Sequence, residues 1–523
     1  MKRRTLLLFC LVVALGAATG CRSRGPSPNL TGNARHVLVV AASIDALSLD
    51  PAVAYEFVSS NVVMNMYQTL IRYDGNDFTK PLPCLADRWK ISRNGLRYTF
   101  HLRRGLRFAS GAPLDAAAVK FSLDRCLTMK AGPSGILSEN LAPDRIHVIN
   151  ARTVQMQLLH PSSYFLCTLF NPAAAIVDPS VVKLHPENWM SDHSAGSGPF
   201  VLQRWERDSD IVLVRNEHYW GPRPPLRRVI IKDVRESGLQ QMMLERGDVD
   251  MALDLTPLQI SEAQAACPRV RVVEGPFLRL FYLGMNVTKA PFRDVRVRQA
   301  IRAAIDYRGL VKYMARGHAI ALQGPIIKGL LGYDPHLGVV KHNPKLARAL
   351  LAAAGYPHGF DTTLYSSSGS TPFGPSREEV CEKLQSDLGK VGIRVHLKML
   401  LGSAYLDLYR HRKTDLNMGD WGADYPDPFN FAQPFGRSDG ALATRVGFSD
   451  PRLDRLIDLA GRELRPDLRR KLYIRIQRRL MKIGPWAILL QPTRELPIRA
   501  EVHGYRYNAM SPMDYGHVRK GQP

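Results

Sequence analysis

The sequence predicts an α/β fold built from more than one domain. Apolar runs of strand length occur at 36–41 and 211–214, and they are rich in valine, leucine and isoleucine. Segments with helical spacing occur at 344–354 and 377–391. Alternation of the two kinds of segment favours α/β architecture, and a chain of 523 residues exceeds the usual size of one hydrophobic core.

The N-terminus has the pattern of a secretory signal peptide over residues 1–20. Three basic residues at 2–4 precede the uncharged run 5–20, which is shorter than the roughly 20 apolar residues of a membrane span. Small residues before Cys21 resemble a bacterial lipobox, although Ala18 replaces the usual leucine. This resemblance implies cleavage before Cys21, lipid attachment to that residue and a membrane anchor; ordinary signal cleavage is the alternative.

A flexible tether is expected at 21–35, because this segment is rich in glycine, proline, serine and asparagine and has little apolar surface. The folded protein is expected to begin near His36. Five cysteines then remain beyond Cys21, without any CxxC spacing. We expect most of them to be buried small side chains, with no metal site.

Turn and helix signals follow in order along the chain. Asn94-Gly95 predicts a hairpin turn between apolar strands, and Gly196 to Gly198 precedes another strand. A helix is expected to begin near Asp294, with Phe292 and Val295 packing against it. These features are interpreted as architectural.

Two later helices have clear local signals. The first, 344–354, starts with proline and stops at Gly355. The second, 377–390, places three apolar side chains on one face: Val380, Leu384 and Leu388. The following run 393–397 alternates as a half-buried strand does, so this region predicts a helix docked beside a sheet.

The net charge of +24 raises the question of nucleic acid. The basic residues are dispersed in pairs such as Arg478-Arg479, however, and no zinc-finger or helix-turn-helix pattern is present. Export also separates the protein from DNA. We therefore expect a cationic solvated surface and no nucleic-acid partner.

Catalysis has no motif support. The sequence contains neither an HExxH zinc motif nor a GxSxG nucleophile elbow. We expect a non-catalytic protein without a cofactor, and an exported peptidase is the competing hypothesis.

Ordered motifs resemble one known family, the extracytoplasmic solute-binding proteins of dipeptide, oligopeptide and nickel ABC importers. They lie at 85–89, 94–108, 111–116, 196–200, 215–221, 246–250 and 291–300. The resemblance covers residues 36 to about 510. It implies a two-lobed periplasmic-binding-protein-like fold of type II, in the large cluster C form, with an extra subdomain inserted in the first lobe.

The resemblance also implies the organisation of the chain. Lobe I is expected at 36–275, with the inserted subdomain at about 60–190; lobe II at 276–489; and a return segment to lobe I at 490–523. Crossovers between the lobes are expected at 277–286 and 489–494. Ligand binding between the lobes and hinge closure would follow.

The stretch at 421–431, WGADYPDPFNF, is the candidate ligand contact. Asp424 resembles the aspartate that pairs with the ligand's N-terminal ammonium in peptide-binding members of the family, and Trp421 resembles a tryptophan that lines the same site. The alternative for Asp424 is an Asx-type turn before Pro426. Residues 426–431 are interpreted as the scaffold.

Two arginines are candidates for a ligand carboxylate. Arg410 resembles an arginine of oligopeptide binders, with the spacing to Trp421 one residue shorter, and Arg377 lies within one position of an arginine of dipeptide binders. On a helix, one position changes direction by about 100°. The alternative for both is a solvated surface charge.

Together these features predict a monomer in the cell envelope, periplasmic or extracytoplasmic, that captures peptides and delivers them to an ABC permease and ATPase complex. A nickel or nickel-chelate carrier, which His411 and other histidines permit, and a ligand-sensing receptor without transport are the alternatives.

Overall fold

The computed structural model describes residues 34–44, 46–75, 77–322, 324–337, 341–510 and 513–521. The predicted signal peptide, the Cys21 lipid site and almost all of the tether lie outside the described residues. Within these ranges, no helix combines the length and the apolar character that crossing a membrane requires.

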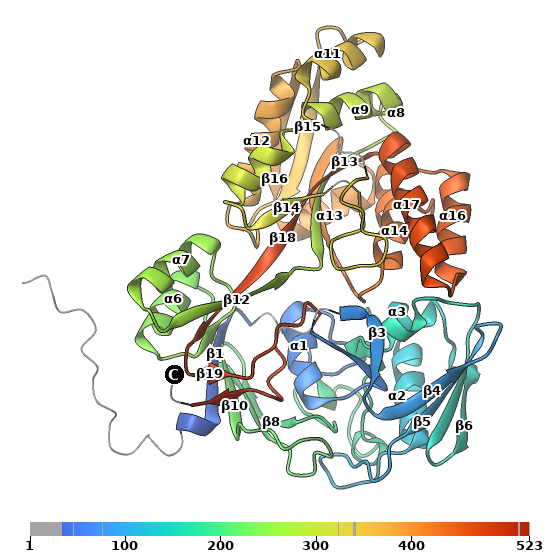
Figure 1. The fold of residues 1–523 in the computed structure, drawn as a ribbon, viewed down its shortest axis with the longest axis vertical. Coiled ribbons are helices and arrows are strands. Elements are labelled where there is room, and N and C mark those ends of the chain that lie inside the picture. Colours follow the sequence, from blue (N-terminus) through green and yellow to red (C-terminus); the bar gives the residue numbers. More distant parts are fainter. Residues whose placement is uncertain are drawn as a thin grey trace, which may run out of the picture.

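The chain folds into two lobes, one above the other in Figure 1. Lobe I comprises η1 to β12, the second half of β18, and β19–β20; lobe II comprises β13 to α17 and the first half of β18. The mixed helices and strands confirm the predicted α/β class.

The strands of lobe I are β1 (Val37–Ala42), β2 (Ile71–Asp74), β3 (Asp77–Pro83), β4 (Ala86–Ile91), β5 (Arg97–Leu102), β6 (Ile146–Asn150), β7 (Thr153–Gln157), β8 (Phe200–Glu206), β9 (Asp210–Arg215), β10 (Arg228–Asp233), β11 (Met251–Ala252), β12 (Val270–Pro276), β19 (Val502–His503) and β20 (Arg519–Lys520). Its helices are η1 (Ala34–His36), α1 (Phe57–Met66), α2 (Ala116–Met129), α3 (Ser134–Ser138), α4 (Phe165–Thr168), α5 (Pro179–Val182), α6 (Ser237–Arg246) and α7 (Pro257–Ala266).

The strands of lobe II are β13 (Arg279–Met285), β14 (Ala319–Ala321), β15 (Phe360–Ser367), β16 (Ile393–Leu400) and β17 (Leu416–Gly422), and β18 (Trp486–Arg499) is shared. Its helices are α8 (Ala290–Arg293), α9 (Val295–Ala304), α10 (Tyr307–Gly309), α11 (Pro344–Ala353), α12 (Arg377–Gly389), α13 (Gly402–Arg410), α14 (Phe429–Gly436), α15 (Ala441–Val446), α16 (Pro451–Arg462) and α17 (Pro466–Ile483).

The main sheet of lobe I has the order β11-β1-β10-β9-β8. β1 runs parallel to both β10 and β11, with Leu38 opposite Val229. A small apolar core joins this sheet to α6 and α7 through Leu244, Ile260 and Ala263. The predicted strands at 36–41 and 211–214 are confirmed as β1 and β9, with His36 just before the first strand.

A separate antiparallel sheet of four strands, β4-β5-β7-β6, lies at the lower right of Figure 1. The predicted hairpin is confirmed, since β4 and β5 pair and Gly95 adopts a φ of +70° in the connecting turn. This sheet and α2 fall within the range expected for an inserted subdomain, whose boundaries stay a prediction.

One glycine allows a close approach of two chain segments in lobe I. A Cβ atom at Gly196 would lie 2.0 Å from the Met66 carbonyl oxygen at the end of α1. Only glycine permits this spacing without a backbone shift, so Gly196 serves close packing between α1 and the segment before β8.

The sheet of lobe II has the order β16-β15-β17-β13-β18. Its core packs against α9, α11 and α12 through side chains such as Ile301, Leu351 and Leu384. Predicted helices at 344–354 and 377–390 are confirmed as α11 and α12, and the predicted strand at 393–397 as β16. Asp294 caps α9 as expected; Phe292 is buried in this core, but Val295 is only half-buried.

Strand β18 belongs to both lobes. Its first part pairs with β13, with Phe281 opposite Leu490, whereas its second part pairs with β12, with Val270 opposite Arg499. The crossover expected at 277–286 is shorter than predicted, because Arg279–Met285 is already strand β13 of lobe II. Residues 277–278 and the middle of β18 thus connect the lobes.

Candidate ligand site between the lobes

The stretch 421–431 lies where the two lobes touch. It follows β17 and leads into α14, both in lobe II. Tyr164 of lobe I stacks on Tyr425, with ring centroids 5.6 Å apart, and on Phe429, at 4.2 Å. All three rings are buried, so apolar packing holds this segment against lobe I.

Asp424 bonds to lobe I through both its side chain and its backbone. The Tyr55 hydroxyl donates to Asp424 Oδ1 at 2.7 Å, and Asn171 Nδ2 donates to the Asp424 carbonyl oxygen at 2.8 Å. Asn430 Nδ2 lies 3.4 Å from Oδ2, and Asn430 Oδ1 accepts from the Asp424 backbone N–H. No ion pair joins the Asp424 carboxylate to a cation in the described part of the chain.

The Asp424 carboxyl group is therefore half-buried at the contact between the lobes and has no counter-charge among the described residues. Burial raises its pKa above the ordinary value, although the hydrogen bonds from Tyr55 and Asn430 act in the opposite direction. A partly desolvated carboxylate of this kind favours a ligand that brings a positive charge.

The Asx-turn alternative fits Asp427 better than Asp424. Asp427 Oδ1 accepts the backbone N–H of Phe429 at 2.8 Å, and Arg469 donates to both carboxylate oxygens at 2.8 and 2.5 Å. The carboxylate of Asp424, in contrast, bonds to two side chains. The structure thus separates a scaffold carboxylate from one that faces the other lobe.

Trp421 is the penultimate residue of β17 and lies opposite Leu280 of β13. Its indole Nε1 donates to the Asn430 carbonyl oxygen at 2.8 Å, and its ring is half-buried beside the large apolar core. Both Trp421 and Asp424 are therefore fixed by the same residue, Asn430, at the start of α14.

Arg377 is close to this segment. It is the first residue of α12, which Ser376 and Glu379 cap reciprocally. The Arg377 guanidinium pairs with Asp420, and its side chain is only 15% exposed. It is therefore not the solvated surface charge of the alternative interpretation.

Arg279 pairs with the same carboxylate from the first position of β13. Although burial raises the pKa of Asp420, the two guanidinium groups outweigh it and hold that pKa below its ordinary value. Two cations on one anion leave a net positive charge, and the buried Arg279 Nε has no hydrogen-bond partner among the described residues. The cationic cluster of Arg377 and Arg279 can therefore bind a second anion in addition to Asp420.

The loop before α12 faces lobe I. A Cβ atom at Gly374 would lie 3.7 Å from Pro257 Cδ at the start of α7. The cationic cluster of Arg377 and Arg279 and the anionic Asp424 therefore both belong to lobe II segments that approach lobe I.

Arg410 is not brought into this group. It is the last residue of α13 and is exposed, whereas Tyr405 and Tyr409 form the buried face of the helix. Within the described ranges, no recorded contact joins Arg410 to Asp420 or Asp424. A role for Arg410 stays a prediction.

Sequence reasoning missed four residues of the site: Tyr55, Asn171, Arg279 and Asp420. One signal was available, since Asp420 is the one charged residue of strand 416–422. The other three residues are distant in sequence and carry no local mark.

In the described ranges, no group of three or more histidine, cysteine, aspartate or glutamate side chains is arranged to hold a metal ion. All five described cysteines are buried and free, which confirms the expectation for their burial.

Comparison with known proteins places these features in context. The sequence model of the bacterial extracellular solute-binding proteins, family 5 Middle, matches residues 80–442. A probable D,D-dipeptide-binding periplasmic protein of Escherichia coli (strain K12) is 32% identical over 485 residues, which cover 91% of this chain and 92% of that protein. A glutathione-binding protein of Salmonella typhimurium is 30% identical over 69% of each chain.

Solved structures show the same fold. A periplasmic binding protein of Helicobacter pylori in complex with the peptide STSA superposes with a TM-score of 0.78 at 26% identity, covering 93% of this chain and 98% of that one. A dipeptide-binding protein of Pseudoalteromonas sp. SM9913, in complex with Met-Leu, has a TM-score of 0.79 at 23% identity, covering 93% of this chain and all of that one.

Proposed function

Since this chain belongs to the bacterial extracellular solute-binding proteins of family 5, we propose that it captures short peptides between its lobes and delivers them to an ABC importer. One observation carries the peptide assignment: Asp424 is a half-buried carboxylate at the lobe junction without a cationic partner in the described residues. The peptide and glutathione ligands named for similar proteins support the same chemical class.

In this proposal, Asp424 binds the N-terminal ammonium of the peptide. The ammonium would replace or join the hydroxyl of Tyr55, which now donates to Asp424 from lobe I. Closure of the lobes removes water from the pair, which strengthens a charge-assisted hydrogen bond. Trp421 would cover the adjacent part of the peptide chain.

The cationic cluster would bind the peptide's carboxylate end. Arg377 and Arg279 together carry one charge more than Asp420 neutralises, and a guanidinium offers more donors than one carboxylate uses. Asp420 would hold both arginines in place when no ligand is bound. Arg410, which is exposed on α13, would contribute only if a longer ligand reached it.

The remaining predictions from the sequence complete the proposal. We propose a non-catalytic monomer of the cell envelope, exported by the signal at 1–20 and anchored to a membrane by lipid at Cys21. We also propose lobe boundaries at 36–275, with its inserted subdomain at about 60–190, and at 276–489, with the return segment at 490–523. The predicted partners are a permease and its ATPase.

Calorimetry with a library of short peptides tests the amine assignment on protein lacking residues 1–35. Truncating one member of a buried charge pair costs about 2–5 kcal/mol, so Asp424→Asn is expected to weaken binding by about 30-fold or more. N-acetylation of the peptide removes the ammonium charge that would pair with Asp424. It should therefore reduce the affinity of the Asp424→Asn variant only a little further.

Asp407→Asn, an exposed carboxylate on α13, is the matched control and should bind peptides normally. Unchanged affinity of the Asp424→Asn variant, or equal binding of acetylated peptides by the unmodified protein, would refute the amine assignment. Stabilisation by Ni²⁺ without any peptide binding would favour the nickel carrier instead.

The carboxylate assignment has a separate test. Peptide amides lack the terminal negative charge, so the unmodified protein should prefer peptide acids to amides. Arg377→Gln should reduce that preference because it removes one of the two guanidinium groups. A preference that persists unchanged would place the carboxylate elsewhere, while the assignment of Asp424 would still stand.

A further inference from the structure

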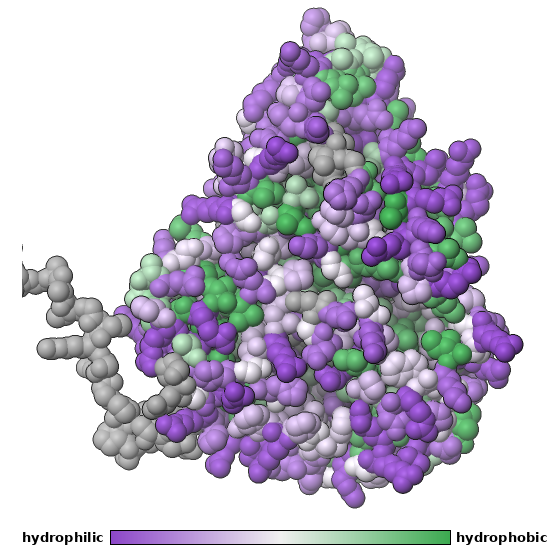
Figure 2. Space-filling view, viewed as in Figure 1, coloured by the Kyte–Doolittle hydropathy of each residue, from purple (hydrophilic) through white to green (hydrophobic). Residues whose placement is uncertain are grey.

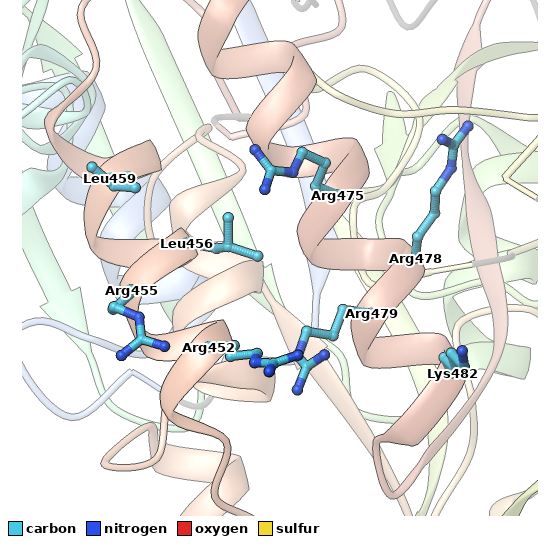
Figure 3. Close-up of a pocket in the computed structure, with 8 residues that line it drawn as sticks. All are labelled: Arg452, Arg455, Leu456, Leu459, Arg475, Arg478, Arg479 and Lys482. Carbon is cyan, nitrogen blue, oxygen red and sulfur yellow. The ribbon is translucent and has the colours of Figure 1, made fainter.

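A basic groove lies between α16 and α17 on lobe II. It encloses about 630 Å³ and is lined by Arg452, Arg455, Leu456, Leu459, Arg475, Arg478, Arg479 and Lys482. Figure 3 shows side chains of α16 and α17 on its two sides, with Leu456 between the helices. None of the residues assigned to peptide capture lines this groove, so it is a second candidate site.

The charge of the groove is almost entirely uncompensated. Arg479 pairs with Asp450 at 2.9 and 2.6 Å, but the other five cationic side chains of the lining have no acidic partner within the described residues. The nearby carboxylates of α16 are engaged elsewhere, because Asp454 accepts from Ser438 and Asp458 pairs with Arg437. Exposed cations gathered in this way attract an anionic partner.

The cations are spaced along both helices. Arg452 and Arg455 are three residues apart on α16, and Arg475, Arg479 and Lys482 follow at intervals of four and three on α17. At a rise of about 1.5 Å per residue, the row on α17 is about 10 Å long. An extended row of cations suits a linear anion with charges at matching intervals.

The groove also exposes aliphatic surface. Leu459 is 57% exposed and Leu456 is half-buried. Apolar atoms lie among the hydrophilic side chains over α16 and α17 at the right of the upper lobe in Figure 2. An aliphatic strip flanked by arginines fits an acidic peptide segment that carries an apolar side chain.

Other anions fit less well. Nucleic acid binding commonly uses aromatic platforms for base stacking, and the lining has no aromatic residue. A membrane surface is broad, whereas this site is a concave groove between two helices. The chain's own tether is unsuitable as an occupant because residues 22–35 contain arginines and no acidic residue.

We propose that the α16–α17 groove docks an acidic, partly apolar segment of a partner protein. The carboxylates of that segment would pair with the arginine rows, and an aliphatic side chain would pack on Leu456 and Leu459. The groove would thus give the protein a contact with a second protein that is independent of its ligand.

Fluorescence anisotropy tests the proposal with protein lacking residues 1–35. The probe is a labelled synthetic helix of about 15 residues with glutamates at i, i+4 spacing and one leucine stripe. The double variant Arg455→Glu/Arg475→Glu should weaken binding by about tenfold or more, because like charges then face the probe. Binding should also fall with added salt.

The matched control is Arg470→Glu/Lys471→Glu, which changes the net charge equally on α17 but outside the groove lining. It should bind within about twofold of the unmodified protein, and a probe with glutamine in place of glutamate should not bind. Equal loss in both double variants would show non-specific attraction and overturn the proposal. Failure of the probe to bind would also overturn the proposal. If the Arg455→Glu/Arg475→Glu variant lost only its sedimentation with phosphatidylglycerol vesicles and not its binding of the probe, the groove would face a lipid surface instead.

Discussion

The ion pair between Asp427 and Arg469 provides a test of what holds the stretch 421–431 in place. The two side chains are 4% and 8% exposed, and they form two hydrogen bonds at 2.8 and 2.5 Å. Asp427→Ala leaves the guanidinium buried without its counter-charge, which costs about 3–5 kcal/mol. Loss of the bond to the Phe429 N–H adds about 1 kcal/mol.

Thermal unfolding converts this loss into a measurable shift. An unfolding entropy of about 2.1 cal/mol/K per residue over roughly 490 residues gives about 1 kcal/mol/K. The melting temperature should therefore fall by about 4–6 °C if the lobes unfold as one unit, and by about 10 °C if lobe II unfolds alone. Scanning calorimetry of the ligand-free protein separates these two cases.

A double variant provides the control. Asp427→Ala/Arg469→Met removes both charges, so it should be more stable than Asp427→Ala alone. The reasoning would be refuted if Asp427→Ala cost less than about 1 kcal/mol, or if the losses of the two single variants simply added.

Three further predictions concern pH, thiols and packing. The pKa of Asp420 is lowered in the folded state, so its contribution to stability is present above about pH 4, the ordinary range of aspartate, and is lost as the pH falls through the folded pKa. Urea titrations at a series of pH values should therefore show a smaller loss of stability at acid pH in the Asp420→Asn variant than in the unmodified protein. Burial raises the pKa of Cys84 to about 11 and those of Cys126, Cys167 and Cys381 to about 12, so Ellman's reagent at pH 8 should react with these four thiols only after denaturant is added. Gly196→Ala should destabilise the protein by about 3 kcal/mol or more because its Cβ would meet the Met66 carbonyl, whereas Gly135→Ala, with no atom within 4 Å, should be neutral or stabilising in differential scanning fluorimetry.

Local signals predicted the helices and turns of this fold well. The helix predicted at 344–354 starts with α11 and ends one residue after it, because proline in the first turn and glycine just past the last turn act over only a few positions. The hairpin at Asn94-Gly95 was equally predictable, since a turn of this type needs a residue that adopts positive φ.

The candidate ligand site could be predicted only in part. Trp421 and Asp424 were selected because they belong to one short motif, but Tyr55 is 369 residues from Asp424 and Arg279 is 141 residues from Asp420. Tyr55 meets Asp424 only where the two lobes touch, and Arg279 meets Asp420 only because β13 pairs with β17. Periodicity and capping encode neither contact. The partner of Arg377 could not be inferred either, because Asp420 lies 43 residues further along the chain on another element.

Strand β18 also constrains the order in which the chain can fold. Residues 493–499 form the strand beside β12, although the rest of the lobe I sheet lies before residue 277. Under the export proposed above, the chain would emerge from a membrane pore N-terminus first, and the sheet of lobe I would stay one strand short until more than two hundred further residues have followed. We therefore expect the early part of the chain to remain incompletely folded through most of translocation, with closure of long-range contacts as the late and slow event.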